Sequence, residues 1–147
     1  MRFDSYIWLM RVRAVEREYL STGFAINALL DRARVDPMIL GEDFEVRDLV
    51  RSAENLEGTY LVRMFSEFET GLRAFWDATR HKESPSRTQD LINGISAQRQ
   101  ISDPQCNAVH AVREYRNLLV HEREEDRIPI TLASSRRSLC RFLSYLR

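Results

Sequence analysis

The sequence predicts an all-α protein, an up-and-down helical bundle of four to five helices in a single domain spanning residues 1–147. Three observations predict it. Apolar residues recur at spacings of three and four along most of the chain, which is the period of a helix buried on one side. No segment shows the alternation of a strand, and several of the five glycines and four prolines fall where helices should end. A chain of 147 residues is long enough to bury one substantial core.

The first predicted helix covers residues 5–33. The Ser-Thr-Gly stretch at 21–23 could kink or split it, and Asp36-Pro37 ends it, because a residue before proline avoids helical geometry. Residues 36–43 are then predicted to form a loop. A short helix should follow over 44–55, with apolar residues on one side.

The strongest apolar stripe predicts a helix over 57–79, and it contains five aromatic residues that are spaced as a buried face requires. The polar stretch 81–87 contains a proline and is predicted to be a loop. Thr88 is a suitable N-cap for a modest helix that continues past Ile95.

The last two helices have clear start signals. Ser102-Asp103-Pro104 places a proline in the first turn of a helix that continues beyond Leu119. The charged run 122–127 is predicted to be a solvated loop. Thr131 can cap a final helix that extends to about residue 146.

Composition narrows the class of protein. Two cysteines, Cys106 and Cys140, are too few for a disulfide framework, so a reducing, cytoplasmic location is expected. Charges interrupt every apolar run, which predicts no signal peptide, no spanning helix and no membrane partner.

The formal net charge of zero conceals an uneven distribution. Residues 1–34 carry a net charge of +2, residues 35–79 carry −6, and residues 80–147 carry +4. Zero net charge argues against a bulk polycation, but the cationic C-terminal part could still hold a local site for a negative substrate. The acidic segment 35–79 could dock a regulatory protein or simply form a solvated face.

The sequence lacks the patterns that are typical of a zinc site, a phosphate-binding loop or a serine nucleophile. The three histidines do not occur at the i, i+4 spacing of a zinc helix, and Cys106 with His110 makes only two ligands. No glycine-rich phosphate loop and no nucleophile elbow is present. We therefore expect no metal and no cofactor.

One constellation remains, at the end of the penultimate predicted helix. Residues 116–121 read Arg-Asn-Leu-Leu-Val-His. Asn117 and His121 are four residues apart and should be neighbours on an exposed edge of the helix, while Arg116 flanks the buried face. Guanidinium suits a phosphate, and imidazole titrates near neutral pH and suits proton transfer. The same histidine could also be favoured merely by the helix dipole.

This motif resembles the signature of the HEPN superfamily, which has an arginine, a polar residue that is commonly asparagine, three further residues and a histidine. In that family the motif lies late in an all-helical bundle, near the end of a long helix. The predicted helices upstream and downstream match that arrangement over nearly the whole chain.

The resemblance implies a metal-independent endoribonuclease, acting as a toxin or antiviral effector, with a composite active site at a homodimer interface. Arg116 would hold the scissile phosphate, His121 would be the general acid or base, and Asn117 would orient or bind the RNA substrate. An antitoxin or other regulatory protein is a possible partner.

Two further positions follow from the resemblance. Family members often place an acidic residue on an early helix near the arginine, and Glu69 is the supporting candidate here. Its ordinary interpretation is an exposed helix position paired with Arg73. One branch of the family carries a modified tyrosine two residues after the histidine, whereas this chain has Arg123, so control by that modification is not expected.

Two alternatives stay open at this point. The chain could be a non-catalytic HEPN domain that binds nucleotide or RNA or serves as a dimerisation module. It could also be a helical structural protein whose motif is a chance match.

Overall fold

The structure, a computed structural model, describes residues 2–121 and 128–147, and every regular element in these ranges is helical. This confirms the predicted all-α helical bundle. The five α-helices are α1 (Ser5–Val35), α2 (Val46–Arg80), α3 (Thr88–Arg99), α4 (Asp103–His121) and α5 (Leu132–Ser144), and a 3₁₀ turn, η1 (Pro37–Leu40), follows α1. The charged run 122–127 lies outside the described residues.

Helices α1 and α2 form a long antiparallel hairpin. Asp4 caps α1 by accepting a hydrogen bond from the Tyr6 amide at 2.9 Å, and the helix ends before Asp36-Pro37, as predicted. The helix is continuous through residues 21–23, so the possible split there does not occur. Its 31 residues give a length of about 46 Å.

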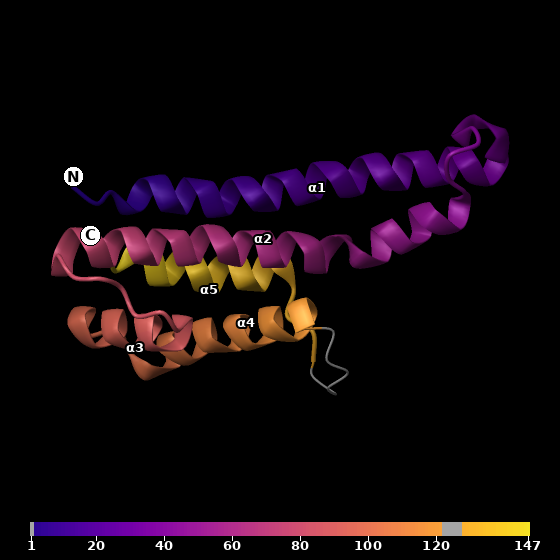
Figure 1. Cartoon of the computed structure of the whole chain (residues 1–147). Coiled ribbons are helices and arrows are strands. Elements are labelled where there is room, and N and C mark those ends of the chain that lie inside the picture. Colours follow the sequence, from indigo (N-terminus) through magenta and orange to yellow (C-terminus); the bar gives the residue numbers. More distant parts are fainter. Residues whose placement is uncertain (1, 122–127) are drawn as a thin grey trace.

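The separate helices expected over 44–55 and 57–79 are one helix, so the predicted break between them is wrong. Glu45 and Asp48 form a capping box that starts α2 at Val46. Gly58 does not interrupt the helix. A Cβ atom there would lie 3.3 Å from the Leu119 side chain, so the missing side chain lets α4 approach closely. Figure 1 shows the first turns of α2 bent relative to the rest.

The remaining helices cover only one part of the hairpin. Helix α5 packs against α1, α2 and α4, while α3 packs against α2 and α4. Figure 1 shows the connected ends of α1 and α2 projecting beyond this bundle as an arm. A small apolar cluster around Leu30, Ala33, Leu40 and Leu49 holds the arm together.

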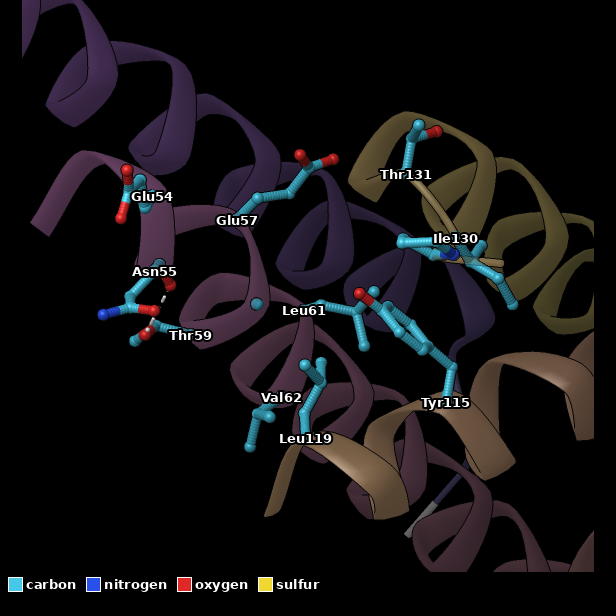
Figure 2. A pocket seen from close by; sticks show the side chains of 12 residues that line it. Glu54, Asn55, Glu57, Thr59, Leu61, Val62, Tyr115, Leu119, Ile130 and Thr131 are labelled. Atoms are coloured by element: carbon cyan, nitrogen blue, oxygen red, sulfur yellow. Dashed lines mark hydrogen bonds between the residues drawn. The ribbon is translucent and has the colours of Figure 1, made fainter. Parts of the chain in front are cut away.

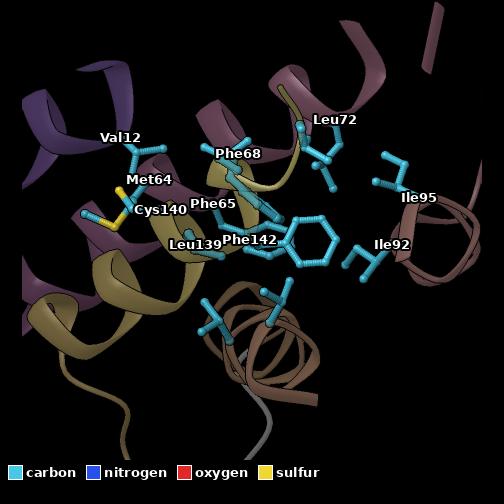
Figure 3. Packing of buried hydrophobic residues seen from close by; sticks show 14 of the residues in the cluster. Val12, Met64, Phe65, Phe68, Leu72, Ile92, Ile95, Leu139, Cys140 and Phe142 are labelled. Carbon is cyan, nitrogen blue, oxygen red and sulfur yellow. The ribbon is translucent and has the colours of Figure 1, made fainter. Parts of the chain in front are cut away.

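The main core lies where all five α-helices meet (Figure 3). Its largest fully buried side chains include Phe65, Phe68, Phe75 and Phe142. Phe68 contacts Phe142 edge-on, with 5.7 Å between ring centroids. This cluster fixes α2 against α5 and so sets the position of α4 between its neighbours.

Candidate active site between α2, α3 and α4

The predicted arginine and the predicted acidic residue meet in the structure. Arg116 Nη2 on α4 lies 3.1 Å from Glu69 Oε2 on α2, and both side chains are about one-fifth exposed (21%). The Arg116 guanidinium also lies over the Phe65 ring, 4.9 Å from its centroid. An aromatic face and a carboxylate therefore hold the cation in one place.

Glu69 connects three elements through its other carboxylate oxygen. Oε1 accepts a hydrogen bond from Arg73 Nη2 at 2.9 Å and another from Thr88 Oγ1 at 2.9 Å. The expected pairing of Glu69 with Arg73 is present, but it is only one part of this network. One carboxylate faces two guanidinium groups, so the cluster retains a net positive charge.

Thr88 does not have the predicted role. The N-cap position of α3 is Arg87, with no side-chain capping hydrogen bond, and Thr88 is the first helical residue. Its hydroxyl donates instead to Glu69, 19 residues earlier in the chain. An N-cap hydroxyl accepts a hydrogen bond from a backbone N–H, whereas the Thr88 hydroxyl donates one to a carboxylate, and hydrogen bonds to charged groups are the stronger kind.

Arg73 anchors the connection between α2 and α3. Its Nη1 donates to Ser84 Oγ and to the Pro85 carbonyl, both at 2.9 Å, while Nη2 reaches the Ser86 carbonyl at 3.4 Å. The start of α3 is thereby fixed beside Glu69. Sequence spacing indicated only the contact of Arg73 with Glu69, because the backbone partners depend on how the connection folds back.

The motif residues occupy the C-terminal turns of α4. The helix extends through His121, so Asn117 and His121 have the i, i+4 relation that was expected. His121 is exposed and Asn117 is partly buried. No hydrogen bond or ion pair between described residues joins Arg116 to either of them. Four residues of helix separate Arg116 from His121, which places the two about 140° apart around the axis and ~7.5 Å apart along it.

The Arg116 guanidinium has hydrogen-bonding capacity that none of the described residues uses. Its Nε is buried and has no acceptor among the described residues. An unmade hydrogen bond of this kind costs about 1–3 kcal/mol.

We expect Glu69→Gln to lower the free energy of unfolding by about 1–3 kcal/mol, because two partly buried guanidinium groups lose their charged acceptor. Urea unfolding followed by circular dichroism measures the change. Glu67→Gln is the matched control, since Glu67 pairs with Arg11 at 3.8 Å across a more exposed surface and should change stability by at most about 0.5 kcal/mol. Equal effects of the two substitutions would contradict the network.

A second polar cluster lies between α3 and α4. His110 Nε2 is 2.8 Å from Asn93 Oδ1, and Arg113 Nε donates to His110 Nδ1 at 3.3 Å. Since Nδ1 accepts, the proton is on Nε2 and the imidazole is neutral. Burial lowers the pKa of His110, the Arg113 charge lowers it further, and Glu114 opposes this.

This arrangement predicts a pH dependence of stability. The folded pKa of His110 lies below the value of 6.5 for an unperturbed histidine, so the unfolded chain binds more protons as the pH falls below 6.5. The contribution of His110 to stability is therefore present above that pH and is lost as the pH falls through the folded pKa.

We expect the urea midpoint of the wild type to fall more than that of His110→Gln between about pH 7.5 and about pH 5.5. His81→Gln, at an exposed position, should keep the wild-type dependence. An unchanged dependence in His110→Gln would show that burial and the Arg113 charge do not lower the pKa of His110 in the folded chain.

Cys106 and His110 were the only suggestive pair of metal ligands. Cys106 Sγ lies 3.3 Å from Ser96 Oγ, and both His110 nitrogens have protein partners. Within residues 2–121 and 128–147, no three His, Cys, Asp or Glu side chains gather as a metal site would require. The described helices also include none that combines the length and apolar character of a membrane span.

A groove of about 630 Å³ lies elsewhere (Figure 2). Its walls come from the middle of α2, the end of α4 and residues 129–131, and they include Glu54, Glu57 and Tyr115. Glu57 Oε1 accepts a hydrogen bond from the Leu132 amide at 2.7 Å and so caps α5. Burial raises the pKa of Tyr115, and the nearby Glu57 charge raises it further. Neither Glu69 nor any of the three motif residues lines this groove.

The candidate site is therefore a cationic region near the C-terminal end of α4, where Arg116 contacts Glu69 and Glu69 contacts Thr88, with Asn117 and His121 on the same end of the helix. Comparison with known proteins found no matching family model, no matching curated protein and no matching solved structure.

Proposed function

We propose that this protein is a metal-independent endoribonuclease of the HEPN type. The observation that carries the proposal is the fixed position of Arg116. Glu69 and Phe65 hold its guanidinium at the same helix end that bears Asn117 and His121. A preorganised cation and an imidazole at one helix end are groups that phosphoryl transfer at RNA can use.

The proposed reaction requires two proton transfers and one stabilised anion. The ribose 2′-oxygen attacks the adjacent phosphorus and loses its proton to a base, while the 5′-oxygen leaves and gains a proton from an acid. The products are a 2′,3′-cyclic phosphate and a 5′-hydroxyl. Arg116 would stabilise the charge on the phosphate oxygens, and Asn117 would orient the substrate.

A homodimer would supply both proton-transfer groups. A single imidazole is either protonated or neutral at a given moment, so it can begin the reaction only as an acid or only as a base. Two copies of the motif facing one cleft provide one histidine for each role. The exposed position of His121 allows such a contact.

The chemistry is tested with a labelled RNA and with the same RNA carrying a single 2′-deoxyribose on the 5′ side of the cleaved bond. We expect cleavage of the RNA in the presence of EDTA, 2′,3′-cyclic phosphate ends, and no cleavage at the substituted position. Cleavage at the deoxy position, or cleavage that requires added metal ion, would rule out the proposed reaction.

The composite site is tested by mixing subunits. Adding an inactive His121→Asn chain to the wild type should reduce activity more than simple dilution does, because mixed dimers contain only one imidazole. Activity that falls only in proportion to the wild-type fraction would contradict a shared site.

The ion pair between Arg116 and Glu69 also supports a second candidate function. A guanidinium that is neutralised by a carboxylate within its own chain suits a non-catalytic domain that binds nucleotide or RNA or mediates dimerisation. Such a domain would bind RNA without cleaving it. Growth arrest on expression, relieved by His121→Asn, would support a toxin or antiviral effector instead, and co-purification of an inhibitory protein would identify an antitoxin.

A further inference from the structure

The outward face of α1 carries large apolar side chains that no other described element covers. Phe24 is 78% exposed and Leu20 is 60% exposed, one turn apart on the helix. Figure 1 shows α1 along an outer edge of the molecule. Two large apolar side chains side by side at the centre of a 31-residue helix are typical of a protein contact rather than of scattered exposure.

Charged residues are placed symmetrically about Phe24 on this face. Arg17 lies seven residues before Phe24 and Asp31 lies seven residues after it. Seven residues are almost two full turns, so all three side chains project in nearly the same direction. Both charged residues are exposed, and no carboxylate within the described part of the chain lies in ion-pair distance of Arg17. Asp31 has only a surface contact of 3.8 Å with Arg34.

This symmetry matches an antiparallel helix pair. When two copies of α1 cross with a twofold axis at Phe24, each residue faces the residue equally far on the other side of position 24. Arg17 then faces Asp31 of the second copy, and the bulky Leu20 faces the small Ala28. Charge and size are therefore complementary at the same register.

We propose that α1 is a self-association surface, on which a second copy of this chain docks antiparallel with Phe24 on the twofold axis. The contact is separate from the motif at the end of α4, and it does not depend on the proposed ribonuclease activity. The neighbouring position Ala25 projects about 100° away around the helix and is outside the contact.

Cysteine cross-linking tests the register. Under mild oxidation, Phe24→Cys should form a covalent dimer rapidly, because a disulfide needs Cα atoms about 4.4–6.8 Å apart. Ala25→Cys, also exposed, is the matched control and should react slowly, and the unsubstituted chain reports on Cys106 and Cys140. Equal rates for Phe24→Cys and Ala25→Cys would overturn the proposal.

Mixing two cysteine variants distinguishes the antiparallel register from cross-linking by random collision. Leu20→Cys alone should not cross-link, because the two copies of residue 20 would lie about 12 Å apart along the axis. A mixture of Leu20→Cys with Ala28→Cys should cross-link. Cross-linking of Leu20→Cys alone to the same extent as the mixture would contradict the antiparallel register.

Exchanging the charges at positions 17 and 31 tests the contact independently, because these variants keep every apolar residue. We expect Arg17→Asp and Asp31→Arg each to halve the mass of the assembly in sedimentation, and the double variant to restore it. An assembly mass unaffected by either single substitution, or a parent chain that sediments as one copy, would overturn the proposal. RNA cleavage by these variants should be unchanged if the motif acts elsewhere. An assembly mass that neither single substitution changes therefore overturns only the α1 contact, whereas a parent chain that sediments as one copy also contradicts the shared active site.

Discussion

His121→Asn is expected to reduce the rate of RNA cleavage by about 10²–10⁴-fold, the contribution typical of a general acid or base. His121 is exposed at the last position of α4, so its replacement removes no core contact and should leave the free energy of unfolding nearly unchanged. Initial rates with a labelled RNA in EDTA, measured alongside urea unfolding, distinguish a loss of chemistry from a loss of fold.

His81→Asn is the matched control for this substitution. His81 is exposed and ends α2 in the left-handed region, with φ of 50°, which asparagine adopts readily. The control should cleave RNA at the wild-type rate. Cleavage retained by His121→Asn, or activity that separates from the protein during chromatography, would show that His121 is not the proton-transfer group.

Arg116 is held by two contacts that both use its planar guanidinium group. Lysine at position 116 would keep the charge but lose the planar group that lies over Phe65 and bonds Glu69. A large loss of activity in Arg116→Lys, with normal folding, would therefore indicate that guanidinium geometry matters and not charge alone.

The helical periodicity predicted the fold because most of these helices bury one face. The apolar stripe over 57–79 contains the centre of the observed core, and Pro37, Pro104 and Thr131 mark helix ends as their chemistry requires. The prediction of a break within α2 was wrong for a physical reason. Glycine at position 58 disfavours a helix when the sequence is considered locally. In the structure it allows close packing of the Leu119 side chain, which comes from a helix about 60 residues away. Local sequence patterns do not contain such contacts.

The candidate site was predictable only in part, for the same reason. The spacing of Asn117 and His121 follows from one helix, and so does the contact between Glu69 and Arg73. The contacts of Glu69 with Arg116 and Thr88 depend on how α2, α3 and α4 pack. Glu69 could be named from the family resemblance, whereas Thr88 could not, because a threonine at a helix start has a sufficient local explanation as a cap.

Phe68→Ala is expected to lower the free energy of unfolding by about 3–5 kcal/mol, the usual cost of removing a buried phenylalanine ring. Phe68 is fully buried and its ring contacts both Phe65 and Phe142, each with centroids 5.7 Å apart. The cavity would open between α2 and α5. Phe65 lies on the same helix and Phe142 on α5, and both belong to the packed core, so they cannot both move toward a smaller side chain and relaxation should recover little of the loss.

Phe44→Ala provides the same chemical change at a site that is 41% exposed, and it should cost about 1 kcal/mol or less because little apolar area leaves water there. Urea unfolding with an unchanged m-value would show that the difference reflects the native state. Similar losses for the two variants would mean that the contact between Phe68 and Phe142 does not organise the core.

Because the same packing places α4 against α2, a folded Phe68→Ala should also loosen the pair between Arg116 and Glu69. It should therefore lose RNA cleavage at lower urea concentration than the wild type, even though residue 68 touches no motif side chain.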